Sequence, residues 1–249
     1  MQLLAHRGAS ADAPENTLEA FAEAVRQQAD GVELDAMVCG SGEVVVCHDE
    51  TLQRLAGVEL AVGATPYRQL RELDVGTRLG FGRARIPLLE EVLDLLPAWM
   101  VVNIELKCDT VEDRGLSWKV ARLVERRQLS ERVILSSFNP LCLFRVAAVA
   151  PPLRRGLLID PDKRFLWQNA VTRPLTANFS VHPHHSQLSP ARLREWRAAA
   201  LEVAVWTVDD PQLASGLREA GVGYCITNRP AALRAGLEIA ASSPDPRSR

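Results

Sequence analysis

At 249 residues and 27.4 kDa, the chain has the length of one or two domains and can bury a substantial core without disulfides or structural metals. Apolar residues make up 47% of it and charged residues 24%, which excludes an intrinsically disordered chain. Its 29 basic and 31 acidic residues leave a net charge of −2, without the basic surplus by which nucleic-acid-binding proteins neutralise phosphates, so no nucleic-acid partner is expected.

Cysteine usage and hydropathy indicate the compartment. The five cysteines are odd in number and form no Cys-x-x-Cys pair, which fits a reducing compartment better than a disulfide framework or a zinc site. The N-terminus has no charged region followed by a long apolar stretch, so no signal peptide is predicted. No segment approaches the roughly 18 apolar residues of a membrane span. We therefore expect a cytoplasmic protein without stable membrane insertion, and its oligomeric state stays open.

Short β-branched segments alternate with segments of helical periodicity along the whole chain. Strands are predicted at 2–6, 31–38, 101–107, 132–136, 154–159, 177–181, 202–208 and 223–227. The first helix is predicted from Leu18, Phe21, Ala22 and Val25, which recur at i, i+3, i+4 and i+7. Later helices are predicted at 88–96, 112–128, 140–149, 189–200, 211–220 and 230–240. Asn16 precedes the first helix, and we favour a capping role for it over a role in a site.

Eight strands separated by helices predict a parallel sheet, because parallel neighbours need crossovers. Eight is also the number that closes into a (β/α)₈ TIM barrel, and we assign the chain to this α/β fold. The alternative is an open doubly wound sheet, but no Gly-x-Gly-x-x-Gly follows the first strand. After the second strand, 43–47 is a short extra strand and about 50–86 a short insertion over one end of the barrel. We therefore expect residues 1–241 to form a single domain and 242–249 a disordered tail.

Two predicted strands carry acidic side chains at alternate positions. Glu33 and Asp35 share one face of their strand, and Asn103, Glu105 and Lys107 share one face of another. At the carboxyl ends of barrel strands such inward-facing groups build active sites, and oxygen ligands suit Mg²⁺, Ca²⁺ or Mn²⁺. The alternative for the first pair is a solvent-exposed strand end. Lys107 would neutralise phosphate oxygens, pair with Glu105, or both.

Histidines add groups that titrate near neutral pH. His6 ends the first predicted strand and is followed by Arg7, and His48 ends the short extra strand. A lone histidine at a strand end is more often structural. Two of them beside three carboxylates, an arginine and a lysine supply what metal-assisted phosphoryl transfer needs. The remaining histidines lie at 182–185, where Pro183 and the lack of a nearby carboxylate predict a loop over the barrel mouth.

The ordered set of motifs closely resembles the glycerophosphodiester phosphodiesterase family, specifically its cytosolic bacterial form. The resemblance covers essentially the whole chain. The motifs that carry it are His6-Arg7-Gly8, Pro14-Glu15-Asn16-Thr17, Glu33-Leu34-Asp35, His48-Asp49, Ile86-Pro87, Glu105-Leu106-Lys107, Ser136-Ser137-Phe138, Val205-Trp206-Thr207-Val208 and Ile226-Thr227-Asn228-Arg229-Pro230.

The resemblance implies a TIM barrel that hydrolyses glycerophosphodiesters, small-molecule substrates, to sn-glycerol 3-phosphate and an alcohol with a divalent cation. By position, the metal carboxylates are Glu33, Asp35 and Glu105, the acid–base pair is His6 and His48, and the phosphate ligands are Arg7 and Lys107. We lean towards His6 as base and His48 as acid. Asn228 departs from the pattern, because many relatives have aspartate there, and its role stays open.

Two aromatic residues stand at strand ends where a wall of the substrate pocket would be useful. Phe138 and Trp206 would contact the glycerol or head group, and buried packing is the competing explanation. Two alternative functions are a phospholipase-like phosphodiesterase acting on lipids and a non-catalytic phosphodiester-binding barrel. The first would need an exposed apolar wedge, for which 79–81 is the candidate. The second should have lost a histidine or an acid, and none is missing.

Overall fold

Eight parallel strands of the computed structural model, which describes residues 1–108, 111–159 and 176–242, form a closed barrel. Each pairs with the next, and β1 pairs with both β2 and β9, which closes the sheet. The predicted (β/α)₈ TIM barrel is therefore confirmed. The barrel strands are β1 (Gln2–His6), β2 (Gly31–Val38), β4 (Val101–Leu106), β5 (Val133–Ser137), β6 (Arg154–Ile159), β7 (Ser180–Pro183), β8 (Glu202–Val205) and β9 (Tyr224–Thr227).

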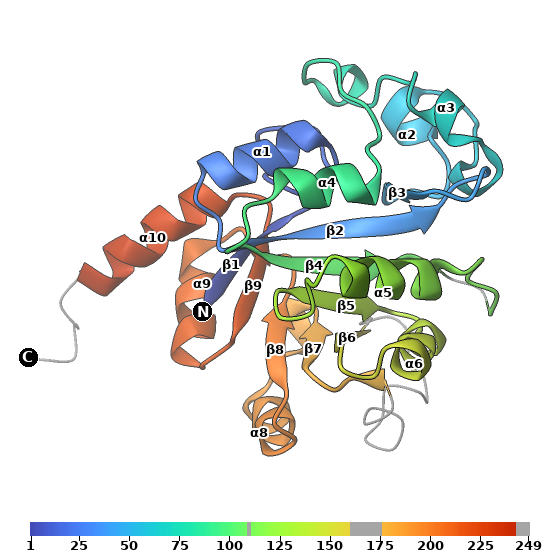
Figure 1. Ribbon diagram of the computed structural model, residues 1–249. Coiled ribbons are helices and arrows are strands. Elements are labelled where there is room, and N and C mark those ends of the chain that lie inside the picture. The colour runs from blue at the N-terminus through green and yellow to red at the C-terminus, as the bar shows by residue number, and fades with distance from the viewer. Residues whose placement is uncertain (109–110, 160–175, 243–249) are drawn as a thin grey trace, which may run out of the picture.

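Helices on the outside of the barrel follow its strands along the chain (Figure 1). They are α1 (Leu18–Arg26), α4 (Leu89–Leu95), α5 (Leu116–Arg126), α6 (Pro140–Val149), α8 (Pro190–Ala198), α9 (Pro211–Glu219) and α10 (Pro230–Ser242). Polar N-caps followed by proline start α6, α8 and α9, because proline needs no amide partner in the first turn. The cap of α1 is Thr17, whose hydroxyl accepts from the Ala20 amide, so the capping role expected for Asn16 is wrong.

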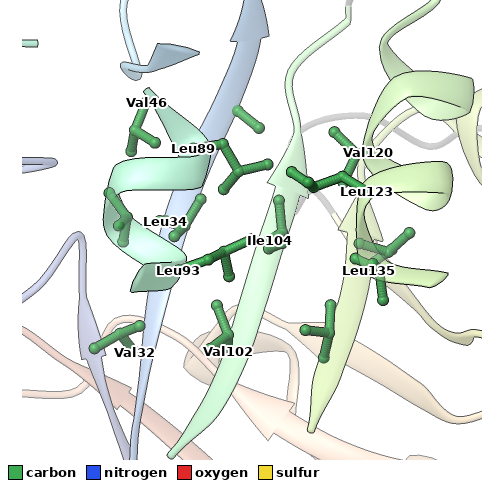
Figure 2. Packing of buried hydrophobic residues seen from close by; sticks show 14 of the residues in the cluster. Val32, Leu34, Val46, Leu89, Leu93, Val102, Ile104, Val120, Leu123 and Leu135 are labelled. Atoms are coloured by element: carbon green, nitrogen blue, oxygen red, sulfur yellow. The ribbon is translucent and has the colours of Figure 1, made fainter. Parts of the chain in front are cut away.

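In β2 and β4 the strand alternation separates an apolar outer face from an inner face that carries the charged side chains. Figure 2 shows Val32 and Leu34 of β2 packed against Leu89 and Leu93 of α4. Both strand residues are fully buried, and β4 and β5 pack in the same way against α5 (Figure 2). Because successive side chains of a strand point to opposite faces, this outward packing turns the residues between them into the barrel.

The insertion lies at the arrowhead end of β2, over the carboxyl rim of the barrel (Figure 1). Strand β3 (Val44–Val46) pairs antiparallel with the end of β2. The insertion continues through α2 (Gln53–Ala56), η1 (Val62–Ala64), α3 (Tyr67–Leu70) and η2 (Thr77–Leu79). Its buried apolar side chains form a cluster of their own with β3, which includes Leu52, Leu55, Val62, Leu70 and Ile86. This cluster holds the chain that follows β3 at the rim.

The structure corrects the prediction at 182–185. His182 lies in strand β7, which runs from 180 to 183 and not from 177 to 181, and the loop predicted there is wrong for this residue. Its side chain is fully buried, Nε2 lies 2.8 Å from the Ser180 hydroxyl, and burial lowers its pKa to about 3. His182 is therefore a neutral core histidine.

Of the tail predicted at 242–249, Ser242 ends α10, and 243–249 lie outside the described residues. Helix η4 (His185–Gln187) follows β7 at the rim. Among the described residues, no helix combines the length and the apolar character needed to cross a membrane.

Candidate active site

Three carboxylates meet inside the carboxyl end of the barrel. Glu33 and Asp35 lie on β2 and Glu105 on the neighbouring β4, where Asp35 is its direct register partner. All three side chains are buried, and one oxygen from each lies within 4.8 Å of the others. The register of β2 against β4 therefore brings together the three carboxylates that the sequence singled out.

The three carboxylates destabilise one another's ionised forms. Burial, and after it the charges of Asp35 and Glu105, raises the pKa of Glu33 well above its usual value. Burial and the charge of Asp35 raise the pKa of Glu105 to about 7. Buried like charges are costly unless a cation neutralises them, and carboxylate oxygens are the ligands of hard divalent cations. The donor set thus fits Mg²⁺, Ca²⁺ or Mn²⁺.

Two cationic side chains border the carboxylates. Nε of Arg7 lies 3.2 Å from Asp35 Oδ2, and Nζ of Lys107 lies 2.9 Å from Glu105 Oε1 and 3.8 Å from Asp35 Oδ1. The backbone amide of Arg7 also donates to Glu33 Oε2 at 3.1 Å. Arg7 has φ +55°, an unfavourable conformation for an arginine, which the surrounding contacts maintain. Two positive charges therefore border the three carboxylates.

His6 faces the carboxylates from the end of β1. Its Nε2 lies 3.9 Å from Glu33 Oε2, and its Nδ1 lies 2.7 Å from Asn228 Oδ1 at the end of β9. Burial, and after it the charge of Arg7, lowers the pKa of His6. A neutral imidazole whose Nδ1 is engaged keeps Nε2 directed at the site. Asn228, whose role the sequence left open, thus contacts His6.

His48 approaches from the chain that follows β3. Its Nδ1 lies 2.7 Å from Asp49 Oδ1, which is possible because β3 ends at Val46 and Asp49 does not continue a strand. Burial alone would raise the pKa of Asp49, but hydrogen bonds from Arg54 and His48 hold it below its usual value. His48 is therefore oriented by a carboxylate, whereas His6 is oriented by a neutral amide.

A chain of alternating charges, which the sequence did not predict, links the two sides of the site. Glu15 accepts from Arg7 and from Arg54 at 2.8 Å each, and Arg54 donates in turn to Asp49 at 2.7 Å. The line from Arg7 therefore runs through Glu15, Arg54 and Asp49 to His48. Glu15 stands in a motif of the family resemblance, which was a signal for it, whereas Arg54 has no local signal.

Asn16 also belongs to the site. Its Nδ2 donates to Asp35 Oδ2 at 2.8 Å, and its Oδ1 accepts from the Asp35 backbone amide at 3.3 Å. The residue adopts φ +58°, a left-handed conformation that asparagine tolerates better than most residues. Both ends of the amide thus hold Asp35 in place.

A cavity of about 670 Å³ opens beside His48 and Lys107. The described residues that line it also include Met37, Asp49, Glu50, Thr51, Gln53, Arg54, Arg78 and Cys108. Phe138 and Trp206 are not among these; they follow β5 and β8 and contact each other edge to face, with ring centroids 5.7 Å apart. Most of the described residues that line the cavity beside His48 are charged or polar.

Comparisons with known proteins agree over nearly the whole chain. Residues 6–232 match the Glycerophosphoryl diester phosphodiesterase family. A glycerophosphodiester phosphodiesterase of Caldanaerobacter subterraneus subsp. tengcongensis is 35% identical over 93% of this chain and 95% of that protein. An Oleispira antarctica phosphodiesterase in complex with the product sn-glycerol-3-phosphate matches with a TM-score of 0.81 at 28% identity, covering 96% of this chain and 97% of that one. A Thermotoga maritima glycerophosphodiester phosphodiesterase matches with a TM-score of 0.78 at 28% identity, covering 95% and 98%. This chain belongs to the glycerophosphoryl diester phosphodiesterase family.

Proposed function

We propose that this protein hydrolyses glycerophosphodiesters to sn-glycerol 3-phosphate and an alcohol, with a divalent cation held by Glu33, Asp35 and Glu105. The observation that supports this best is the convergence of these three buried carboxylates with two cationic and two imidazole side chains at one rim of the barrel. Family membership supports the same reaction.

The charged groups divide between the cation and the substrate. When bound, a divalent cation supplies positive charge at the phosphoryl oxygens, which gain negative charge in the transition state. Arg7 and Lys107 lie beside the carboxylates and would bind the remaining phosphate oxygens. Their positions orient the phosphorus before reaction, which removes part of the entropic barrier.

The histidines would act on opposite sides of the phosphorus. The lowered pKa of His6 keeps its Nε2 unprotonated, so His6 would take the proton of the attacking group, either water or a glycerol hydroxyl. His48 is oriented by its 2.7 Å contact with the Asp49 carboxylate and would give a proton to the leaving alcohol. The leaving alcohol would occupy the cavity that His48 lines. Phe138 and Trp206 would form an apolar wall for the glycerol moiety.

Hydrolysis of glycerophosphodiesters of several head groups, assayed in parallel with Mg²⁺, Ca²⁺ and Mn²⁺, tests this function. We expect release of sn-glycerol 3-phosphate, its loss with a chelator, and its loss in Glu33→Gln. Glu131→Gln, which changes a glutamate at the surface, is the matched control and should keep full activity. Binding of the diesters without any turnover would instead favour a binding barrel, and turnover confined to lipid vesicles would favour a phospholipase.

A further inference from the structure

The orientation of the Asn228 amide is determined by Asp209. Nδ2 of Asn228 lies 2.7 Å from Asp209 Oδ2, and a carboxylate oxygen only accepts, so the NH₂ group must face Asp209. The amide oxygen then faces the opposite way, towards Nδ1 of His6 at 2.7 Å. The Ser10 hydroxyl donates to this same oxygen at 2.9 Å. Because an amide oxygen only accepts, Nδ1 of His6 must carry the hydrogen.

Asp209 is itself held by three donors from the end of β9. Its Oδ1 accepts from the Asn228 backbone amide at 2.8 Å and from the Thr227 hydroxyl at 2.9 Å, while Oδ2 accepts from the Asn228 side chain. Thr227 is fully buried. The carboxylate of Asp209 thus joins the loop after β8 to the end of β9. These hydrogen bonds fix the side chains of both Asp209 and Asn228.

We propose that Asp209 is a positioning residue that sets the tautomer of His6 through the side chain of Asn228. The line Asp209, Asn228, His6 places the hydrogen on Nδ1 and leaves the lone pair of Nε2 directed towards the carboxylates of the site. This inference rests on the proposed function only where it gives His6 the part of the base. His48 instead contacts the Asp49 carboxylate directly through Nδ1, so the two imidazoles are oriented by different chemistry.

The substitution Asp209→Asn tests this line because it changes one oxygen to NH₂. The atom that accepts from Thr227 and from the Asn228 amide must remain oxygen, so the new NH₂ faces the NH₂ of Asn228. Two donors cannot share a hydrogen bond, and Asn228 then turns its own NH₂ towards His6. Nδ1 of His6 must accept, its hydrogen moves to Nε2, and the lone pair at the site is lost.

The double substitution Asp209→Asn with Asn228→Asp should repair this defect. The carboxylate at 228 accepts from His6 Nδ1 and from the new amide at 209, whose oxygen still accepts from Thr227. Every donor again meets an acceptor, with the charge moved one residue closer to His6. Asp210→Asn is the matched control, because within the described part of the chain Asp210 serves as the cap of α9, and asparagine is an equally good cap.

The experiment combines histidine ¹⁵N NMR with kinetics on glycerophosphocholine at saturating divalent cation. His6 resonances are assigned by their absence in His6→Gln. We expect the hydrogen on Nδ1 in the wild type, in Asp210→Asn and in the double variant, and on Nε2 in Asp209→Asn. We expect kcat of Asp209→Asn to fall about 10²-fold or more with KM changed less than about threefold, and the double variant to recover to within about fivefold.

The inference is overturned if Asp209→Asn leaves the tautomer on Nδ1, or if the double variant is no better than the single one. Thermal unfolding of each variant separates a tautomer effect from misfolding, since a misfolded single variant would not lose kcat alone. If the wild-type protein shows no diesterase activity, the proposed function fails. The NMR comparison still decides whether Asp209 sets the tautomer.

Discussion

His6 and His48 reach the same rim with different partners, and this difference supports the parts proposed for them. His6 is largely buried, its pKa is lowered, and its partner is a neutral amide. His48 is a third exposed, and its partner is the Asp49 carboxylate, which Arg54 holds in place. The lowered pKa of His6 suits a base, and the Asp49 carboxylate orients the more exposed His48, so these environments support His6 as the base and His48 as the acid.

The acid is dispensable when the leaving group is a weak base. We expect His48→Ala to lose about 10²–10⁴-fold in kcat on glycerophosphocholine but to retain most activity on the 4-nitrophenyl ester of glycerol 3-phosphate, because nitrophenolate departs without a proton. His6→Ala should lose activity on both substrates, because both need the attacking group deprotonated. Steady-state kinetics on the two substrates measures the difference. If His48→Ala lost as much activity on the nitrophenyl ester as on glycerophosphocholine, the assignment would be contradicted.

At the scale of the elements, the site depends on how β2 lies against β4. The register pairs Glu33 with Asn103 and Asp35 with Glu105, so a shift of one residue would turn one set of carboxylates into the helix layer. Gly31 begins β2 opposite Val101, and a methyl group there would overlap the carbonyl oxygen of Val101. This glycine therefore lets the two strands approach where the register begins.

Two glycine-to-alanine substitutions should have opposite effects. Gly31→Ala should lower the free energy of unfolding by about 1–3 kcal/mol, because the obstacle is backbone that cannot move aside without separating the strands. Gly216→Ala, in the middle of α9 with nothing within 4 Å of the added atom among the described residues, should raise it by about 0.5–1 kcal/mol. Urea unfolding measures both, and diesterase activity should fall only in the first. If Gly31→Ala left the free energy of unfolding unchanged, the close approach of β2 and β4 at Gly31 would be refuted.

At the scale of the whole molecule, the carboxylate cluster couples stability to pH and to cation binding. Burial raises the pKa of Glu105 from 4.5 to about 7, so the folded protein without a cation binds more protons than the unfolded chain between these values. The free energy of unfolding therefore falls as the pH rises from about 4.5 to about 7, by about 3 kcal/mol from this group. A cation bound by these carboxylates, as we propose, would reverse the effect because it would favour their ionised forms.

We therefore expect Mg²⁺ or Ca²⁺ to raise the melting temperature, and to raise it more at pH 8 than at pH 5.5. At a hundred times its dissociation constant, the cation should add about 2.7 kcal/mol of stability. In Glu105→Gln both the stabilisation by the cation and the loss of stability towards pH 7 in its absence should shrink. Thermal unfolding with and without chelator measures these changes, and an equal rise at both pH values would argue against the carboxylates as ligands.

Local patterns in the sequence determined much of this architecture. The alternation in β2 and β4 predicted which side chains line the barrel, because a strand buried against helices must turn its other face inward. The order of eight strand and helix segments predicted closure. The cytoplasmic location, the single domain and the parts of the site residues stay predictions.

Only the tertiary structure decided which distant residues complete the site. His6 and Asn228 are 222 positions apart, and Asn16 and Asp35 are 19 apart, yet both pairs are hydrogen-bonded. The same holds for Arg54, which contacts Glu15 over 39 positions. Periodicity records the face on which a side chain lies within its own element. Which side chains from different strands meet at the rim depends on barrel closure, register and loop paths, and no local spacing encodes these.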